Sequence, residues 1–405
     1  MNPLRLVVVG TVASSPYAGM AWMHMQLAVG LRRLGHDVYY IEATSVWPYD
    51  PFRGMKVDDS DYAVPYLAGV AESFDFRDRW AYRRSFSDKE WLGMPRQKAE
   101  DLLAHADAVF DIAGATPFLR SDEGLEVGRL IYYGTDPVYH EVQFANGDPL
   151  TQLLVDEHDD VVTFGENIGN EYCSIPPLPR LRAKTRQPVL IDLWQVGPPP
   201  AGASFTTVCN WKQEGHDVEF RGDTYYWSKH IEFLKFIELP LRTQQPIELG
   251  MGLTGAADAA LNDPIPALGM ASDEHRMLKA NDWLLTDSHA FTTNPWSYRK
   301  YIQASRAEFT VAKDQNVRLR SGWFSERSAC YLAAGRPVVT QDTGFGTVLP
   351  TGEGLFAFNN MDAILAAFDT INTNYERHSR AARELAEEYF RAETVLGRLL
   401  DELGL

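Results

Sequence analysis

The sequence predicts an α/β protein made of two halves, each built on a parallel sheet. Three observations support this fold class. A strand, a helix and a second strand follow one another over residues 4–41, a proline-rich segment interrupts the pattern at 176–188, and a second series of strands and helices begins at residue 189. A chain of 405 residues is also long enough for two separate cores. The expected divisions are 1–180, 189–375 and a C-terminal helix over 376–405.

The composition is that of a globular protein, with 45% hydrophobic and 23% charged residues. A formal net charge of -17 argues against a general nucleic-acid binder, because such binding depends on many Lys and Arg contacts to phosphates. The three cysteines show neither a zinc spacing nor a disulfide framework, which fits a reducing cytoplasm. No signal peptide is indicated, and no stretch reaches the about 20 apolar residues of a membrane span. We therefore expect a cytoplasmic protein without a transmembrane segment, which leaves peripheral membrane contact open.

The first strand is predicted at residues 4–9, where a mostly aliphatic run is typical of a strand buried on both faces. Leucines then recur at helical spacing up to Gly35, which is placed to end the helix, and a second aliphatic run follows at 38–41. His24 lies near the start of this helix. It is a candidate general base, but a partly buried helix histidine beside two methionines is the favoured interpretation.

A later strand of the first half ends in Gly134-Thr135-Asp136-Pro137. Ligands of parallel sheets bind at the loops that follow the carboxyl ends of the strands. Asp136 is therefore our first candidate for a catalytic or acceptor-orienting carboxylate. An aspartate that caps the turn before Pro137 is at least as good an explanation.

In the second half, residues 321–346 predict a helix and then a strand. Ser325 is a good N-cap, Gly335 is placed to end the helix, and Pro337 prevents its continuation before two valines open the strand. A glycine-bearing loop beside a helix N-terminus offers backbone N–H groups and a positive dipole end to an anion such as a diphosphate. A purely structural helix–strand unit would have the same pattern, so both interpretations stay open.

The segment Ala334–Gly344 resembles the "A-x-G-x-P-V-V-x-x-D-x-G" motif of the nucleotide-sugar-binding domain in GT-B glycosyltransferases, especially the group-1 type that includes glycogen- and sucrose-synthase-like enzymes. Residues 18–38 are similar to the opening helix of the same family. Retaining members carry two glutamates eight residues apart. This chain has Gly322 and Cys330 in those positions, with Glu326 as the nearest carboxylate.

The resemblance implies a GT-B fold, in which two Rossmann-like domains with parallel sheets face each other across a cleft and the C-terminal helix crosses back to the N-terminal domain. It implies acceptor contacts within residues 44–100. It also places basic residues after the first strand of the second half, where Lys212 matches and Lys229 is a second choice. Trp283 either stacks on a base or belongs to the core. The expected donor-binding residues are Gly19, Lys212, Trp283, Gly322, Ser325, Glu326, Arg327, Asp342, Thr343 and Gly344.

The function implied is transfer of a sugar from a UDP- or GDP-sugar to an unidentified acceptor, a glycan, a lipid-linked sugar or a small molecule, without an obligatory metal or cofactor. No G-x-G-x-x-G follows Val9 and no Walker lysine motif is present, which argues against a nicotinamide dehydrogenase and a P-loop enzyme. Two alternatives stay open: a nucleotide-sugar 2-epimerase of the same fold, and a catalytically inactive sugar-binding or complex-forming subunit.

Overall fold

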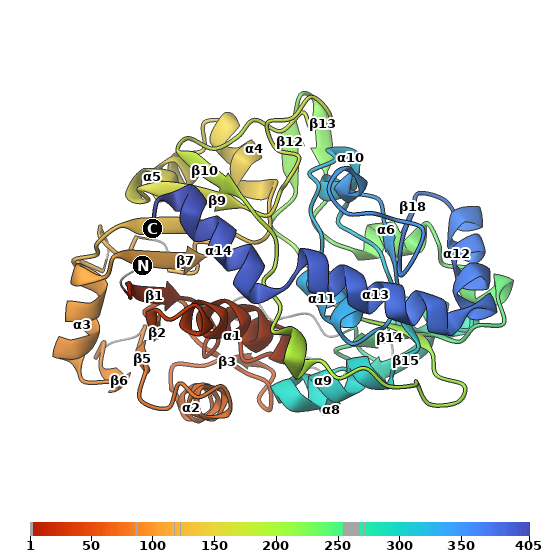
Figure 1. Cartoon of the computed structure of the whole chain (residues 1–405), viewed down its shortest axis with the longest axis horizontal. Coiled ribbons are helices and arrows are strands. Elements are labelled where there is room, and N and C mark those ends of the chain that lie inside the picture. Colours follow the sequence, from red (N-terminus) through yellow and green to blue (C-terminus); the bar gives the residue numbers. More distant parts are fainter. Residues whose placement is uncertain (1–2, 86–87, 117, 122, 254–267, 271) are drawn as a thin grey trace. The chain divides into compact units, whose positions relative to one another are not determined.

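The computed structural model describes residues 3–85, 88–116, 118–121, 123–253, 268–270 and 272–405. The chain forms two compact units, each with its own sheet (Figure 1). Unit 1 contains Met1–Phe164, Pro177–Leu190 and Ala392–Leu405, and unit 2 contains Gly165–Pro176 and Ile191–Arg391. The chain therefore passes through unit 2 for twelve residues, Gly165–Pro176, before it returns to unit 1.

Unit 1 is built on an eight-stranded sheet with the order β10-β9-β8-β7-β1-β2-β5-β6. Neighbouring strands run parallel except β6, which pairs antiparallel with β5. The strands are β1 (Arg5–Val9), β2 (Asp37–Glu42), β5 (Trp80–Arg83), β6 (Trp91–Gly93), β7 (Ala108–Ile112), β8 (Leu130–Gly134), β9 (Asp160–Thr163) and β10 (Leu181–Lys184). The central strands β1, β7 and β8 are mostly apolar and buried, as expected when helices cover both faces of such a sheet.

The helices of unit 1 are α1 (Ala18–Arg33), α2 (Ala63–Ser73), α3 (Arg96–His105), α4 (Tyr139–Ala145), α5 (Pro149–Glu157) and α14 (Ala392–Leu403), with a short hairpin of β3 (Tyr49–Asp50) and β4 (Met55–Lys56). Helix α3 covers one face, where Leu102 and Leu103 join the core formed by Val7 and Val109. Helix α14 lies along α1 (Figure 1), and a Cβ on Gly30 would come within 2.5 Å of Leu396. Gly30 thus allows the last helix to approach α1 closely.

Unit 2 is built on a six-stranded parallel sheet with the order β15-β14-β11-β16-β17-β18. Its strands are β11 (Phe205–Val208), β14 (Ile247–Met251), β15 (Leu284–Asp287), β16 (Ala307–Thr310), β17 (Val338–Gln341) and β18 (Leu355–Phe358). Phe205 and Phe309 pack against Phe368 with ring centroids 4.5 and 5.8 Å apart, and these aromatic contacts form the centre of the core.

The helices of unit 2 are α6 (His230–Leu234), α7 (Asp273–Ala280), α8 (His289–Thr292), α9 (Pro295–Ala304), α10 (Asp314–Arg318), α11 (Glu326–Ala333), α12 (Met361–Thr373) and α13 (Tyr375–Tyr389), and a hairpin of β12 (Val218–Phe220) and β13 (Asp223–Tyr225) precedes α6. The terminal helix expected over 376–405 forms as two helices. Helix α13 belongs to unit 2 and α14 to unit 1. They separate at Phe390, whose ring is buried 5.4 Å from that of Phe324.

Among the described residues, no helix combines the length and the apolar character that crossing a membrane requires.

Candidate functional site

The carboxyl edge of the unit 2 sheet gathers three basic side chains, Lys229, Lys313 and Arg327. Lys229 comes directly before α6, Lys313 is the residue that precedes α10, and Arg327 lies in the first turn of α11. Arg327 and Lys313 lie close enough to Lys229 for their positive charges to lower the pKa of its amino group. Loops after parallel strands thus bring together cations that are far apart in the sequence.

Arg327 is held firmly by the sheet. Its guanidinium donates to Glu308 Oε1 at 2.5 Å, to the Val208 carbonyl at 2.6 Å and to Thr310 Oγ1 at 2.9 Å. The Glu308 side chain is fully buried, so this ion pair is shielded from water. Arg327 therefore fixes the start of α11 onto β11 and β16, and its charge is largely compensated by Glu308.

Lys229 is different because, among the described residues, its ammonium forms no ion pair with a carboxylate. Within the part of the chain that the structure describes, the contact of its Nζ is with the Trp323 ring, whose centroid is 5.7 Å away. Burial, together with the cations of Arg327 and Lys313, lowers the pKa of Lys229 to about 7. A half-buried, unpaired cation is unfavourable until an anion neutralises it. Lys229 therefore marks a position that suits an anionic ligand.

Helix α11 begins beside this cluster. Ser325 precedes the helix with extended backbone angles, φ -77° and ψ 137°, but its side chain makes no capping hydrogen bond. The buried hydroxyl of Ser328, in the first turn, also has no hydrogen-bond partner among the described residues. Uncapped N–H groups and the positive end of the helix dipole add to the attraction for an anion.

The other predicted donor residues of unit 2 lie in several environments. The Lys212 ammonium pairs with Glu274 in α7 and is partly exposed. Trp283 is only 1% exposed, lies in the core and donates from Nε1 to the Ile237 carbonyl at 2.7 Å. The structure thus places Trp283 in the core, one of the two expectations for it. Lys212 differs from Lys229 in having a carboxylate partner.

Glu326, Asp342 and Thr343 are close to the start of α11 but are engaged within the protein. Glu326 Oε1 accepts from the Cys330 thiol at 3.1 Å. Asp342 Oδ1 accepts from the Gly344 N–H at 2.8 Å, and Thr343 donates to the Trp323 carbonyl at 2.6 Å. Of these contacts, the hydrogen bond from Thr343 to Trp323 joins the 342–347 loop to the 320–325 loop.

Gly322 and Gly344 both have positive φ, 78° and 91°. A Cβ on either residue would collide with Asn167, at 2.8 Å from its backbone N for Gly322 and 2.6 Å from its Nδ2 for Gly344. The sequence analysis expects both glycines among the donor-binding residues. In the structure, the space beside them is filled by Asn167, a residue that the sequence reasoning did not select.

At the carboxyl edge of the unit 1 sheet, the loop after β1 is held from inside the protein. Glu42, which is fully buried, accepts from the N–H groups of Ala13 at 2.8 Å and Ser14 at 2.6 Å. The Val12 N–H donates to the Tyr40 hydroxyl at 2.9 Å. Burial raises the pKa of Glu42 to about 7, although these hydrogen bonds favour its charged form. The loop amides therefore point at protein groups and are not available to a phosphate.

His24 takes part in the same arrangement. Its Nε2 accepts from the Thr11 N–H at 3.2 Å, and its Nδ1 lies 2.7 Å from the Met20 carbonyl, to which it donates. The ring is completely buried, and burial lowers its pKa to about 4. Because both ring nitrogens are engaged, the structure assigns His24 to holding the loop. Gly19, nearby in α1, is half-buried.

Asp136 lies in the turn after β8, and this turn contains an unusual backbone conformation. Val138, a buried β-branched residue, has φ 95° and ψ -54°. Its N–H donates to Glu141 Oε2 at 2.8 Å. Glu141 is buried, and burial raises its pKa to about 7. Strain of this kind costs about 1–3 kcal/mol and is found preferentially at functional sites. The strained turn therefore keeps Asp136 as a candidate functional residue.

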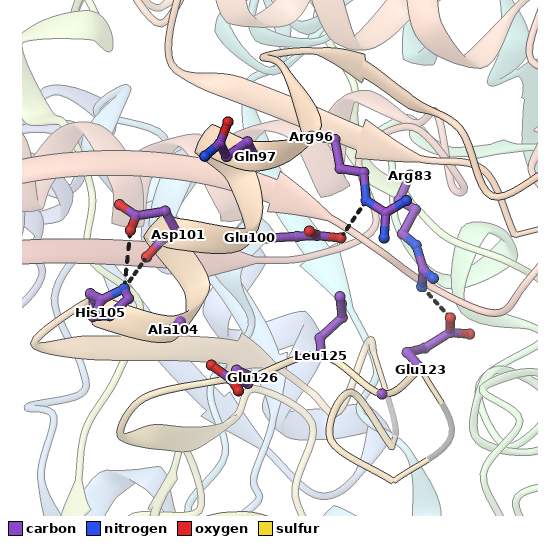
Figure 2. Close-up of a pocket in the computed structure, with 11 residues that line it drawn as sticks. Arg83, Arg96, Gln97, Glu100, Asp101, Ala104, His105, Glu123, Leu125 and Glu126 are labelled. Atoms are coloured by element: carbon purple, nitrogen blue, oxygen red, sulfur yellow. Dashed lines mark hydrogen bonds and ion pairs between the residues drawn. The ribbon is translucent and has the colours of Figure 1, made fainter.

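A surface hollow of about 680 Å³ lies between α3 and residues 123–126. Figure 2 shows the residues that line it. Four of its charged side chains form ion pairs: Arg83 with Glu123, and Arg96 with Glu100. The Nδ1 atom of His105 lies 3.2 Å from Asp101 Oδ1. Because both of its arginines have carboxylate partners, this hollow is a poorer candidate for an anion site than the cluster around Lys229.

Among the described residues, no group of three or more His, Cys, Asp or Glu side chains is arranged to hold a metal ion.

No protein-family model matches the chain, and no curated protein sequence matches it. Solved structures do match over nearly the whole chain. HepE from Anabaena, in complex with UDP and glucose, gives a TM-score of 0.58 at 11% identity and covers 99% of both chains. An α-glucosyltransferase in complex with UDP and a DNA 13-mer gives 0.58 at 10% identity and covers 100% of both chains. Sucrose-phosphate synthase from Thermosynechococcus elongatus gives 0.54 at 13% identity and covers 98% of this chain and 99% of that one.

At identities of 10–13%, these structural matches show that the folds are similar and show nothing further. They confirm that the chain has the α/β GT-B fold, as the resemblance of its motifs to group-1 glycosyltransferases predicted.

Proposed function

We propose that this protein is a glycosyltransferase that moves a sugar from a UDP- or GDP-sugar to a hydroxyl group of an acceptor. The observation that carries the proposal is the unpaired ammonium of Lys229 beside Arg327 and the N-terminus of α11. The GT-B fold makes a nucleotide diphosphate the anion that best suits this cluster. UDP is bound in the HepE structure and in the α-glucosyltransferase structure, which favours UDP as the first nucleotide to test.

The chemistry needs stabilisation of a leaving group. When the bond between the anomeric carbon and the diphosphate oxygen breaks, negative charge develops on the diphosphate. In our proposal the Lys229 ammonium and the N–H groups of the first turn of α11 stabilise that charge, while Arg327 keeps the helix in place. These groups would act without a metal ion.

On the acceptor side, we propose Asp136 as the carboxylate that orients or deprotonates the acceptor hydroxyl. It follows a strand of the unit 1 sheet in a turn fixed by Glu141. We do not propose a catalytic role for His24, because both of its nitrogens are engaged. The net charge of -17 favours a glycan, a lipid-linked sugar or a small molecule over a nucleic acid as acceptor.

The test is incubation with a panel of UDP- and GDP-sugars, followed by measurement of nucleoside diphosphate release with and without candidate acceptors. Release that depends on one donor supports a transferase. An altered sugar that remains attached to its nucleotide indicates an epimerase. Release from no donor, together with no binding of UDP or GDP, contradicts the proposal.

A second candidate, an inactive subunit that binds nucleotide sugars, is favoured by one observation. The positions of the family's two glutamates hold Gly322 and Cys330, and neither offers a carboxylate. Micromolar binding of a nucleotide sugar without any turnover, across the whole panel of acceptors, would support this candidate over the enzyme.

A further inference from the structure

A single buried side chain joins the two loops that border the start of α11. Asn167 is completely buried, and its Nδ2 donates to the Arg320 carbonyl at 3.1 Å and to the Gly344 carbonyl at 3.0 Å. Its Oδ1 accepts from the Thr347 hydroxyl at 2.7 Å, and its backbone N–H donates to the Ser321 carbonyl at 3.0 Å. Both amide protons and the amide oxygen are therefore used.

The partners of Asn167 lie far away in the sequence. Arg320 and Ser321 belong to the 320–325 loop, and Gly344 and Thr347 belong to the 342–347 loop. The loops also contact each other, since the Gly322 N–H donates to the Thr343 carbonyl at 2.9 Å. Asn167 thus supplies the side chain that ties both loops to the Gly165–Pro176 segment.

The two glycines explain why an amide of this size fits. Gly322 and Gly344 adopt positive φ, and a Cβ on either one would lie 2.8 Å or less from Asn167. Any side chain at these positions would meet both a strained backbone and the asparagine. The glycine positions and Asn167 therefore form one arrangement, in which the glycines make room for the amide.

This arrangement sets the position of the groups around Lys229. The 320–325 loop carries Trp323, whose ring contacts the Lys229 ammonium, and it leads directly into Ser325 and α11. The 342–347 loop holds the Trp323 carbonyl through Thr343. A shift of either loop would move the indole and the helix start relative to Lys229.

We propose that Asn167 is a positioning residue for the nucleotide diphosphate site of unit 2. This inference rests on the proposed function, because it assumes that the site at Lys229 and α11 binds a nucleotide diphosphate. Asn167 acts through the loops, and none of its polar groups is left for the ligand. Loss of its amide leaves the Arg320 and Gly344 carbonyls without this donor. The 320–325 and 342–347 loops then sample positions in which Trp323 and the start of α11 are displaced from Lys229.

The first experiment measures the loops directly and needs no ligand. Hydrogen exchange in Asn167→Ala should become at least about tenfold faster in peptides covering 320–323 and 342–347 than in wild type, while peptides from the β11 and β16 core stay unchanged. Unchanged exchange in both loops would overturn the inference, whatever the protein binds.

The second experiment measures UDP affinity by calorimetry. Asn167→Ala should weaken UDP binding at least about tenfold at a temperature where the variant is fully folded. Asn167→Asp keeps the size but places a carboxylate against two carbonyls, and it should behave in the same way. Ile371→Ala is the matched control, because Ile371 is a fully buried residue of α12 in the unit 2 core. It should lower the melting temperature and leave UDP affinity unchanged.

A double-mutant cycle separates positioning from general stability. Thr347→Val removes one hydrogen bond to Asn167 and should weaken UDP binding two- to threefold alone, but not further in the Asn167→Ala background. Equal UDP affinity of wild type and Asn167→Ala would overturn the inference. A wild type that binds neither UDP nor GDP would contradict the proposed function instead, and the exchange experiment would still decide whether Asn167 holds the loops.

Discussion

At the carboxyl edge of the unit 1 sheet, backbone N–H groups of the connecting loops point at buried carboxylates, whereas at the same edge of the unit 2 sheet the clustered side chains are cations. In unit 1, Glu42 holds the loop after β1 and Glu141 holds the turn after β8. In unit 2, Lys229, Lys313 and Arg327 come together, and Glu308 forms an ion pair with Arg327.

The two sheets have similar architecture, but the different charges at their carboxyl edges suit them to different ligands in the proposed function. A loop whose amides already bind a carboxylate of the protein has little to offer a phosphate. A cationic edge with an unpaired ammonium favours the binding of a phosphate. In the proposed function, the acceptor hydroxyl, which is neutral and must lose a proton, is assigned to the edge that carries carboxylates.

The largest effect should come from removing the unpaired cation. We expect Lys229→Ala to weaken UDP binding about 100-fold, equivalent to about 2.7 kcal/mol, because a partly desolvated charge–charge contact with the diphosphate is lost. Calorimetric titration with UDP checks this result. Lys229→Arg, which keeps the charge, should recover part of the affinity. If Lys229→Ala binds UDP as wild type does, the cationic edge is not the nucleotide site.

The strain at Val138 should be visible in a pair of variants. Val138→Ala and Val138→Gly both lose the buried isopropyl group, but only glycine accepts φ 95° without strain. The glycine variant should therefore be more stable than the alanine variant by about 1–2 kcal/mol, or several degrees in melting temperature. If the turn positions Asp136, the glycine variant should nevertheless have the lower kcat. Equal melting temperatures would show that the turn stores no strain.

The buried carboxylates of unit 1 predict a pH dependence. The pKa of Glu42 is raised above its unfolded value, to about 7, so its contribution to stability is present at low pH and is lost as pH rises through 7. The free energy of unfolding of unit 1 should fall by about 0.8 kcal/mol between about pH 6.5 and about pH 8.5 from this residue alone. Glu141 should add a decrease in the same direction.

Urea titrations across that range, followed by a probe in unit 1, provide the measurement. The Glu42→Gln variant should show a smaller decrease than wild type, because it has no proton to lose there. The chosen range lies above the pKa of His24, about 4, and at or above that of an unfolded histidine, about 6.5, so its opposite contribution is largely avoided. An identical slope in the variant would contradict the assignment.

The smallest effect is expected at Lys212. Its ammonium is partly exposed and already pairs with Glu274. Lys212→Ala should change UDP affinity less than about twofold and stability by no more than about 1 kcal/mol, as is usual for surface ion pairs. A large loss of UDP affinity would make Lys212 a donor ligand after all, and would mean that the ion pair opens when nucleotide binds.

Residues close to one another in the sequence were enough to predict the start and end of α11 and the start of β17. Ser325 precedes α11, Gly335 follows its end with φ 67°, and β17 begins at Val338 directly after Pro337. Each of these boundaries is set by the backbone preferences of one or two residues, which a sequence shows directly. The two α/β halves could be predicted for the same reason.

Tertiary contacts decided the rest. Lys212 and Lys229 are both lysines in the long connection after β11. Only the fold shows that Lys212 has a carboxylate partner, whereas Lys229 has none in the part of the chain that the structure describes. Asn167 lies more than 150 residues from each loop that it joins. A glycine with positive φ, such as Gly322, indicates a close approach, but the approaching group is not encoded nearby. Such contacts need the folded chain.

The position of α14 has a consequence for biosynthesis. This helix covers α1, and the missing side chain of Gly30 leaves room for Leu396. Unit 1 therefore contains a segment, Ala392–Leu405, that is translated after all of unit 2. A nascent chain on the ribosome can complete unit 2 while the apolar side of α1 still lacks its cover. Truncation before Ala392 should therefore expose that side and cause aggregation of the newly made protein, even though no residue of the proposed nucleotide site is removed.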